Sequence, residues 1–331
     1  LTGSTPGNDM KLSLSRVESN RNFANKLWQA ARFVLGNLGD RAASFVPPAT
    51  LDPATLTNTA DRWIVSRFHG LVAEVDRLFT AYQLGEAGRQ IYDFVWGEYC
   101  DWYIEMSKVR LRGQGGPDAD QALQVLVYVL EGCLTLLHPY MPFVTEAIWQ
   151  YLPHEGEALI VADWPRGTGR DEQAEADLAA LMELVRAIRN VRSEYEVETS
   201  RRIGAVIAAG ERLPLLQEQR EALELLARID PAQLTLVAAL DSHPAQTVGV
   251  VAGGFEGYLP LAALVDLEAE RERVAKQLAE LAAEVARSEK LLSNPNFIAK
   301  AKPEVVEHER AKLADLRERQ AKLDARRQAL A

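Results

Sequence analysis

The C-terminal segment constrains the fold of this chain most strongly, because apolar residues recur there at alternating steps of three and four. Such a heptad pattern forms the seam along which two helices pack. Pro295 and Pro303 separate the two patterned stretches and forbid one continuous helix. Residues 265–331 are therefore predicted to form an antiparallel coiled-coil hairpin. The seam positions are Leu267, Val274, Leu278, Leu281, Val285 and Leu292 in the first stretch, and Val306, Glu309, Leu313, Leu316, Gln320, Leu323, Arg327 and Leu330 in the second.

The charge of this predicted hairpin differs from that of the rest of the chain. The whole sequence has a net charge of -10, yet residues 266–331 hold 14 basic and 13 acidic residues. Basic and amide side chains around an exposed aromatic suit a nucleic-acid backbone and an unstacked base. The alternative is an ordinary charged coiled-coil surface. The candidate binding residues near the tip are Arg287, Lys290, Asn294, Phe297, Lys300 and Lys302.

Composition narrows the class of protein. A chain of 331 residues suggests two or three domains. Its 47% apolar and 25% charged residues are ordinary for a globular protein, and we expect no membrane span and no export signal. Cys100 and Cys133 give neither a disulfide framework nor a zinc pair, which favours a reducing cytoplasm. The net negative charge argues against indiscriminate nucleic-acid binding but leaves room for a local basic surface.

Helical patterns dominate the first half of the chain and predict an antiparallel helical bundle. The patterned segments are residues 13–38, a helix opening near residue 59, and residues 86–111, 119–137, 144–152 and 171–197. Between the last two, residues 159–165 are a short strand candidate. Further on, the β-favouring runs 202–209, 232–240 and 247–254, with a helix over 215–229, predict a small α+β domain over 198–264.

Two groups of polar residues in the helical region could contact RNA. Basic and amide side chains can reach phosphates and base edges in a single-stranded loop. In both groups an ordinary solvated helix face is an equally good explanation. The first group is Arg21, Asn22, Asn25 and Lys26; the second, spaced at steps of three and so expected along one face, is Arg186, Arg189 and Arg192.

The residues offer no recognisable catalytic site. The five histidines are scattered, and neither phosphate-loop motif is present, since the glycines of "GGFEG" have the wrong spacing and indicate a turn. The aromatic residues of the third predicted helix occupy too many sides to form a stacking platform, so most are expected in the core. The pattern therefore indicates a binding protein with no catalytic residues and no metal ligands. Those aromatic residues are Tyr92, Phe94, Trp96, Tyr99, Trp102 and Tyr103.

Several stretches together resemble the class I aminoacyl-tRNA synthetases, and among them the valyl-tRNA synthetases. The matching stretches include "RNFANKLW" (21–28), "IYDFVWGEYCDWYIEMSKVRL" (91–111), "LVRAIRNVRSEYEV" (184–197) and "LSNPNFIAKAKPEVV" (292–306). The resemblance implies a mainly α fold, with residues 13–197 as an anticodon-binding helical bundle and residues 265–331 as an arm that holds the outer corner of tRNA. It also implies a cytoplasmic monomer with valine tRNA and a catalytic domain as partners, and neither DNA nor membrane.

The catalytic motifs of that family are missing. There is no His-Ile-Gly-His-type motif, and Lys11-Leu12-Ser13-Leu14-Ser15 only imitates the Lys-Met-Ser-Lys-Ser loop, because Leu14 replaces the second lysine. Residues 1–12 are therefore expected to be a linker from a catalytic domain, with Ser13 or Ser15 as the helix N-cap. ATP and Mg would belong to the full enzyme, with no cofactor in this chain, which should be inactive alone. The rival hypotheses are a free-standing tRNA-binding paralogue and a coiled-coil scaffold for proteins.

Overall fold

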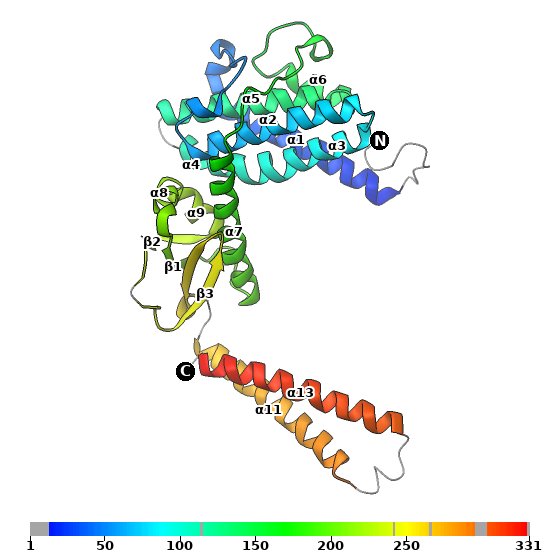
Figure 1. Cartoon of the computed structure of the whole chain (residues 1–331), viewed down its shortest axis with the longest axis vertical. Helices are drawn as coiled ribbons and strands as arrows, with labels where there is room; N and C mark the ends of the chain where they lie inside the picture. The colour runs from blue at the N-terminus through cyan, green and yellow to red at the C-terminus, as the bar shows by residue number, and fades with distance from the viewer. Residues whose placement is uncertain (1–12, 113–114, 241, 265–266, 295–302, 330–331) are drawn as a thin grey trace. The chain divides into compact units, whose positions relative to one another are not determined.

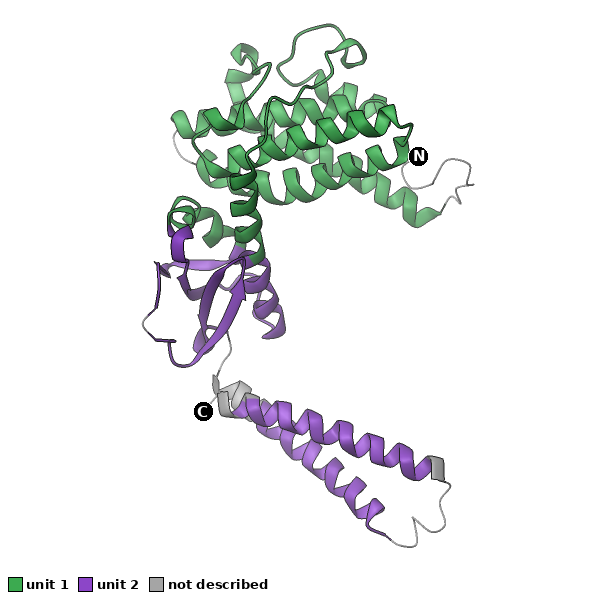
Figure 2. Cartoon of the chain, in the orientation of Figure 1, with its two compact units in different colours: residues 1–183, 214–226 green, residues 184–213, 227–331 purple. Residues whose placement is uncertain are grey.

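The structure, a computed structural model, describes residues 13–112, 115–240, 242–264, 267–294 and 303–329. It is mainly helical, with one small mixed sheet (Figure 1). The chain divides into two compact units (Figure 2). The first unit comprises residues 1–183 and 214–226, and the second comprises residues 184–213 and 227–331. The predicted mainly α fold class is therefore confirmed, whereas the predicted domain boundaries stay predictions.

Helices build the first unit, and most of them were expected from the sequence. A π-helical segment, Phe94–Tyr103, joins α3 to α4 in one continuous helical run. The helices are α1 Leu14–Leu38, α2 Thr59–Thr80, α3 Leu84–Asp93, α4 Ile104–Leu111, α5 Pro117–Leu137, α6 Pro142–Trp149, the first part of α7 Glu172–Glu194, α8 Leu213–Glu218 and α9 Arg220–Ala227.

Side-chain caps fix where the first two long helices begin. The Ser13 hydroxyl accepts a hydrogen bond from the Arg16 backbone N–H at 3.3 Å, and the Asn58 side chain accepts one from the Ala60 N–H at 2.9 Å. Such bonds satisfy amide donors that a helix leaves unpaired in its first turn. The predicted N-cap at Ser13 is confirmed, and so is the helix opening near residue 59.

Helix α5 forms the centre of the first unit. Fifteen of its residues are buried, from Ala119 to Leu137. By length and composition α5 could cross a membrane, but 78% of its apolar window is buried within the protein, as in the core helix of a globular domain. The six aromatic residues expected in the core behave mainly as predicted, since only Tyr92 and Trp96 among them are partly exposed.

A buried carboxylate ties four segments of this unit together. The Asp61 side chain on α2 is fully buried. It accepts hydrogen bonds from both Nη atoms of Arg110 at 2.6 and 2.9 Å, from Gln121 Nε2 at 2.7 Å and from the Tyr103 hydroxyl at 2.7 Å. Each of these donor residues comes from a different element, so one residue locks α2, the π-helical segment, α4 and α5 in register.

The predicted strand over residues 159–165 is wrong. Leu159–Val161 form a short 3₁₀ turn, followed by irregular chain. The Leu159 backbone N–H donates to Glu146 Oε2 at 2.9 Å, and the Leu159 side chain is buried. The Glu146 carboxylate thus accepts the backbone hydrogen bond that a neighbouring strand would accept. The buried Leu159 side chain anchors the loop.

The second unit contains a four-stranded sheet in the order β2-β1-β4-β3. The strands are β1 Ile203–Ala208, β2 Ile229–Val237, β3 Thr247–Ala252 and β4 Phe255–Pro260. β1 and β2 are parallel, whereas β4 is antiparallel to β1 and to β3. Three strands were predicted and β4 was missed. Gly253 and Gly254, with φ of 60° and 78°, make the β3–β4 turn, in agreement with the turn expected at "GGFEG".

The second unit also contains the end of α7 and the short helix α10 Leu261–Leu264. Its two long helices, α11 Leu267–Leu292 and α13 Pro303–Ala329, lie side by side and run in opposite directions (Figure 1). Ser288 Oγ donates to Glu309 Oε1 at 2.6 Å, and Arg317 Nη2 donates to Glu289 Oε1 at 2.8 Å. The hairpin itself is thus observed, while its supercoiling stays a prediction. The buried members of the predicted seam are Val274, Leu278, Val285, Val306 and Leu316.

Candidate nucleic-acid interface

One face of α1 presents polar side chains while the opposite face is packed. Phe23, Leu27 and Val34 are buried, because helical periodicity brings them to the side that meets the bundle. Arg21, Asn22 and Asn25 reach the surface from the other side of the same helix. Their donors are therefore available to a ligand, although their contact with RNA stays a prediction.

Lys26, the fourth predicted residue of this group, is more tightly held. Its Nζ lies 2.7 Å from Asp101 Oδ1 and 5.2 Å from the centroid of the Trp96 ring. Burial disfavours the charge, but the hydrogen bond to Asp101 and its negative charge outweigh burial, so the pKa of Lys26 is raised. Lys26 thus remains a cation and fixes the edge of an aromatic cluster.

That aromatic cluster was missed by the sequence analysis. Phe23 and Tyr92 have ring centroids 4.5 Å apart, and Tyr92 and Trp96 have centroids 5.8 Å apart with nearly parallel rings. Beside them lies a cavity of about 150 Å³, which Asn20, Tyr92 and Tyr140 help to line. The signal in the sequence was the i, i+4 spacing of Tyr92 and Trp96, which places two rings on one helix face. Aromatic rings beside an amide offer the chemistry needed to hold an unstacked base.

The three arginines of α7 do not share one exposed face. Arg186 and Arg189 are exposed, but Arg192 is buried, and its Nη2 donates to the carbonyl oxygens of Glu198 at 3.0 Å and Arg201 at 2.8 Å. Steps of three fall short of a full helical turn by about 60° each, so the third arginine rotates onto the packed side. Arg192 therefore supports the chain after α7, so the expectation that the three arginines lie along one face is wrong, whereas RNA contact by this group stays a prediction.

The hairpin offers exposed cations near the end of α11. Arg287 and Lys290 are exposed, and Asn294 follows the helix, also exposed. These three stand where the sequence analysis expected a binding site. The other predicted tip residues, Phe297, Lys300 and Lys302, lie outside the described residues.

Within the described ranges, no group of three or more His, Cys, Asp or Glu side chains could hold a metal ion. The buried His69 is engaged on both nitrogens, by the Gly169 carbonyl at 2.9 Å and the Tyr128 hydroxyl at 3.0 Å. Burial raises the pKa of Cys100 to about 12, and that of the fully buried Cys133 well above its usual range. These thiols therefore stay protonated and unreactive at neutral pH.

Comparison with known proteins gives matches over both units. Residues 61–207 match the anticodon-binding domain of tRNA ligase, and residues 266–331 match the valyl tRNA synthetase tRNA binding arm. Valine–tRNA ligase of Carboxydothermus hydrogenoformans is 45% identical over 318 residues, which cover 95% of this chain and 35% of the relative. The corresponding protein of Symbiobacterium thermophilum is 42% identical over 349 residues, covering 98% of this chain and 38% of the relative. That of Bacillus cereus strain ATCC 14579 is 40% identical over 332 residues, covering 100% and 37%.

The mainly helical structure is consistent with the match to an anticodon-binding domain. The chain spans 35% to 38% of the length of these three relatives. From the two domain matches and from the identity over nearly all of its residues, the chain belongs to the valyl-tRNA synthetase family and corresponds to the C-terminal part of its members.

Proposed function

We propose that this chain is the tRNA-binding portion of a valine–tRNA ligase, the enzyme that attaches valine to its tRNA at the expense of ATP. The observation that carries the proposal is the pair of matches, to an anticodon-binding domain over residues 61–207 and to a tRNA binding arm over residues 266–331. The helical unit would check the anticodon and the hairpin would hold the tRNA elbow. Their contribution to catalysis would be orientation and binding energy.

The surfaces described above suit this division of labour. The exposed donors Arg21, Asn22 and Asn25 lie on the helix that also carries Phe23, a member of the aromatic cluster. Amide donors and rings can distinguish bases in a single-stranded loop. Arg287 and Lys290 on α11 are charged and long, which suits phosphate contacts that carry little sequence information.

Further parts of the proposal concern the whole enzyme. The hairpin is proposed to be a coiled-coil arm, and the catalytic domain of the same enzyme to be the partner that holds ATP, Mg and valine. In this chain we expect no cofactor, no DNA partner, and a monomer in the cytoplasm. Each expectation is consistent with a translation enzyme.

A binding experiment with the 331-residue chain tests the proposal. Its affinity for valine tRNA is compared with that for a tRNA of another amino acid, and with that for valine tRNA carrying a substituted anticodon. Valine tRNA should bind most tightly, and the anticodon substitution should weaken binding by about 1–3 kcal/mol, the range found for loss of a well-placed base contact. Equal affinity for all three RNAs would contradict anticodon recognition, and absence of binding would contradict the proposal as a whole.

A further inference from the structure

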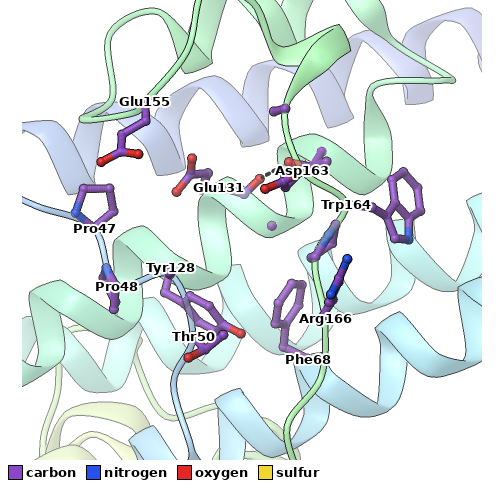
Figure 3. Close-up of a pocket in the computed structure, with 15 residues that line it drawn as sticks. Pro47, Pro48, Thr50, Phe68, Tyr128, Glu131, Glu155, Asp163, Trp164 and Arg166 are labelled. Atoms are coloured by element: carbon purple, nitrogen blue, oxygen red, sulfur yellow. Dashed lines mark hydrogen bonds between the residues drawn. The ribbon is translucent and has the colours of Figure 1, made fainter.

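A second cavity in the first unit has a volume of about 480 Å³ and shares no lining residue with the cavity beside the aromatic cluster of α1. Helices α2 and α5 supply its floor, and the chain segments 47–50 and 162–166 supply its sides (Figure 3). Phe68 and Gly132 meet at the floor, where a Cβ on Gly132 would lie only 2.1 Å from the Phe68 ring. The glycine thus lets the ring fill the floor, and the cavity is large enough for a small organic molecule.

Acidic side chains outnumber basic ones in the lining. Glu131, Glu155 and Asp163 contribute three carboxylates, and Arg166 contributes one guanidinium. In Figure 3 the three acidic residues follow one side of the opening, with the Tyr128 and Phe68 rings on the other. Across the described part of the chain, none of the three carboxylates forms an ion pair with a basic side chain. The lining therefore has an excess of acidic over basic side chains, which Arg166 offsets only in part.

Glu131 is the best defined of these acids. It is half-buried on α5, and its Oε1 accepts a hydrogen bond from the Trp149 indole N–H at 3.3 Å. Burial raises the pKa of Glu131, although the Trp149 bond and the nearby His154 act in the opposite direction. A carboxylate in this position gains from a cation brought close to it, because the cation offsets the lost hydration of the charge.

The aromatic walls are held in place by hydrogen bonds to residues behind them. The Trp164 indole N–H donates to Asp76 Oδ1 at 2.8 Å, and the Tyr128 hydroxyl is bonded to His69 Nε2 at 3.0 Å. Fixed aromatic faces attract organic cations, most strongly where water is excluded. The cavity thus combines two features that suit an ammonium or guanidinium group, carboxylates and rigid rings.

Two other kinds of ligand fit less well. A metal ion needs several ligand atoms converging within a few ångströms, and no such group of three or more acidic, His or Cys side chains occurs in the described residues. A nucleotide would bring phosphates next to three carboxylates, which repel them. The lining therefore favours a positively charged organic ligand with spaced amino groups.

We propose that this cavity binds a small aliphatic polyamine, with one ammonium group on Glu131 and another on Asp163 or Glu155. The site is separate from the proposed tRNA-binding residues and does not depend on them. It would let the concentration of a polyamine influence the stability of the helical unit, because a ligand that binds only the folded state stabilises that state.

Calorimetric titration of the 331-residue chain with spermidine at 150 mM salt, roughly the physiological ionic strength, tests the proposal. We expect one saturable site with a dissociation constant below about 1 mM. Glu131→Gln and Asp163→Asn should each weaken binding by about tenfold, the effect of losing a charged hydrogen-bond partner. Arg166→Gln should strengthen binding, because it removes the one opposing charge.

Glu157→Gln is the matched control, since Glu157 is exposed in the same region and does not line the cavity. It should leave the affinity unchanged. The proposal is wrong if spermidine shows no saturable binding, if the control weakens binding as much as Glu131→Gln, or if a nucleoside monophosphate binds the cavity in its place. Circular dichroism of each variant establishes that the comparison is between folded proteins.

Discussion

The helical bundle of the first unit and the hairpin of α11 and α13 are both helical, but they are stabilised differently. In α5 fifteen residues are buried, whereas in α13 only Val306 and Leu316 fall in that class among its described side chains. The bundle also buries a carboxylate, Asp61, inside a complete hydrogen-bond network. The ion pairs of the hairpin are exposed, as in the contact of Arg317 with Glu289, whose side chains are 60% and 47% exposed.

This difference in packing determines which kind of binding surface each region can carry. The bundle has an apolar core large enough to hold rings and cavities at fixed positions, so it can discriminate between ligands by shape. The hairpin has one apolar seam and leaves the rest of its surface to charged side chains. We infer that the bundle provides specificity and that the hairpin provides electrostatic affinity.

The largest expected effect comes from removing the buried carboxylate. Asp61→Ala leaves Arg110 buried without its main counter-ion, and should lower the free energy of unfolding of the bundle by about 3–5 kcal/mol. All six tryptophans lie in residues 1–183, so denaturation followed by tryptophan fluorescence reports on the bundle. An exposed ion pair on the same helix offers the control: Glu74→Ala, which removes the partner of Arg77, should lower the free energy of unfolding by much less. A loss below about 1 kcal/mol for Asp61→Ala would show that the network is not what holds the bundle.

A substitution in the seam of the hairpin should unfold the hairpin without unfolding the bundle. Leu316→Glu places a charge among the buried residues between α11 and α13 and should unfold the hairpin. The lost packing alone should cost about 2 kcal/mol, and burial of the charge adds to that cost. Far-UV circular dichroism should lose helix while the fluorescence midpoint of the bundle stays unchanged. Ala314→Glu, an exposed position on the same helix, should change neither signal. If Leu316→Glu also shifts the fluorescence midpoint, the two regions are not independent.

Substitutions at the two proposed RNA surfaces should differ in kind. Arg21→Ala on the bundle should reduce discrimination between valine tRNA and its anticodon-substituted form. Lys290→Ala on the hairpin should instead weaken the binding of both RNAs equally. Each loss should be about 1–2 kcal/mol, in the range for one base or phosphate contact. Arg77→Ala serves as control, because Arg77 is an exposed cation paired with Glu74 on α2. The same loss of discrimination from both test substitutions would remove the proposed division of roles.

The smallest expected effect is a pH dependence of the bundle. Burial lowers the pKa of His69, so the folded state binds its proton less readily than the unfolded state, where the pKa is about 6.5. Stability contributed by the neutral imidazole is thus present above that value and is lost as pH falls through the folded pKa. The slope from one proton cannot exceed about 1.4 kcal/mol per pH unit. The denaturation midpoint followed by fluorescence should decrease from pH 7.5 to pH 5.5, and His69→Gln should make this decrease smaller. If the decrease is the same in the variant, the pH dependence comes from other groups.

Features that depend on periodicity and capping were predicted well from the sequence. The heptad positions Val285 and Leu316 are buried, and Ser13 caps the first helix, because spacing and capping are local properties. Predictions that depend on tertiary neighbours were less successful. The strand predicted at residues 159–165 failed because Glu146 takes the Leu159 amide, and Arg192 is buried because it bonds to the carbonyls of two later residues.

The candidate site divides along the same line. Arg21, Asn22 and Asn25 could be chosen from the sequence because they are polar residues between apolar positions of one helix. Tyr92 and Trp96 could not be distinguished from core aromatics, because their partial exposure depends on how α1 meets them through Phe23. The acidic cavity was also invisible, since its residues come from α2, α5 and two separate loops.

The central claim is that this chain binds tRNA and that the hairpin contributes phosphate contacts. Its most direct test is the salt dependence of tRNA binding by the intact chain and by Lys290→Ala. A protein that neutralises phosphates releases counterions, so the logarithm of the affinity should fall linearly with the logarithm of the salt concentration. We predict a steep slope for the intact chain, and a slope smaller in magnitude by about 1 for Lys290→Ala, with the preference for valine tRNA retained. An affinity for valine tRNA that barely changes between low and high salt, or a slope that is the same in both proteins, would contradict the account.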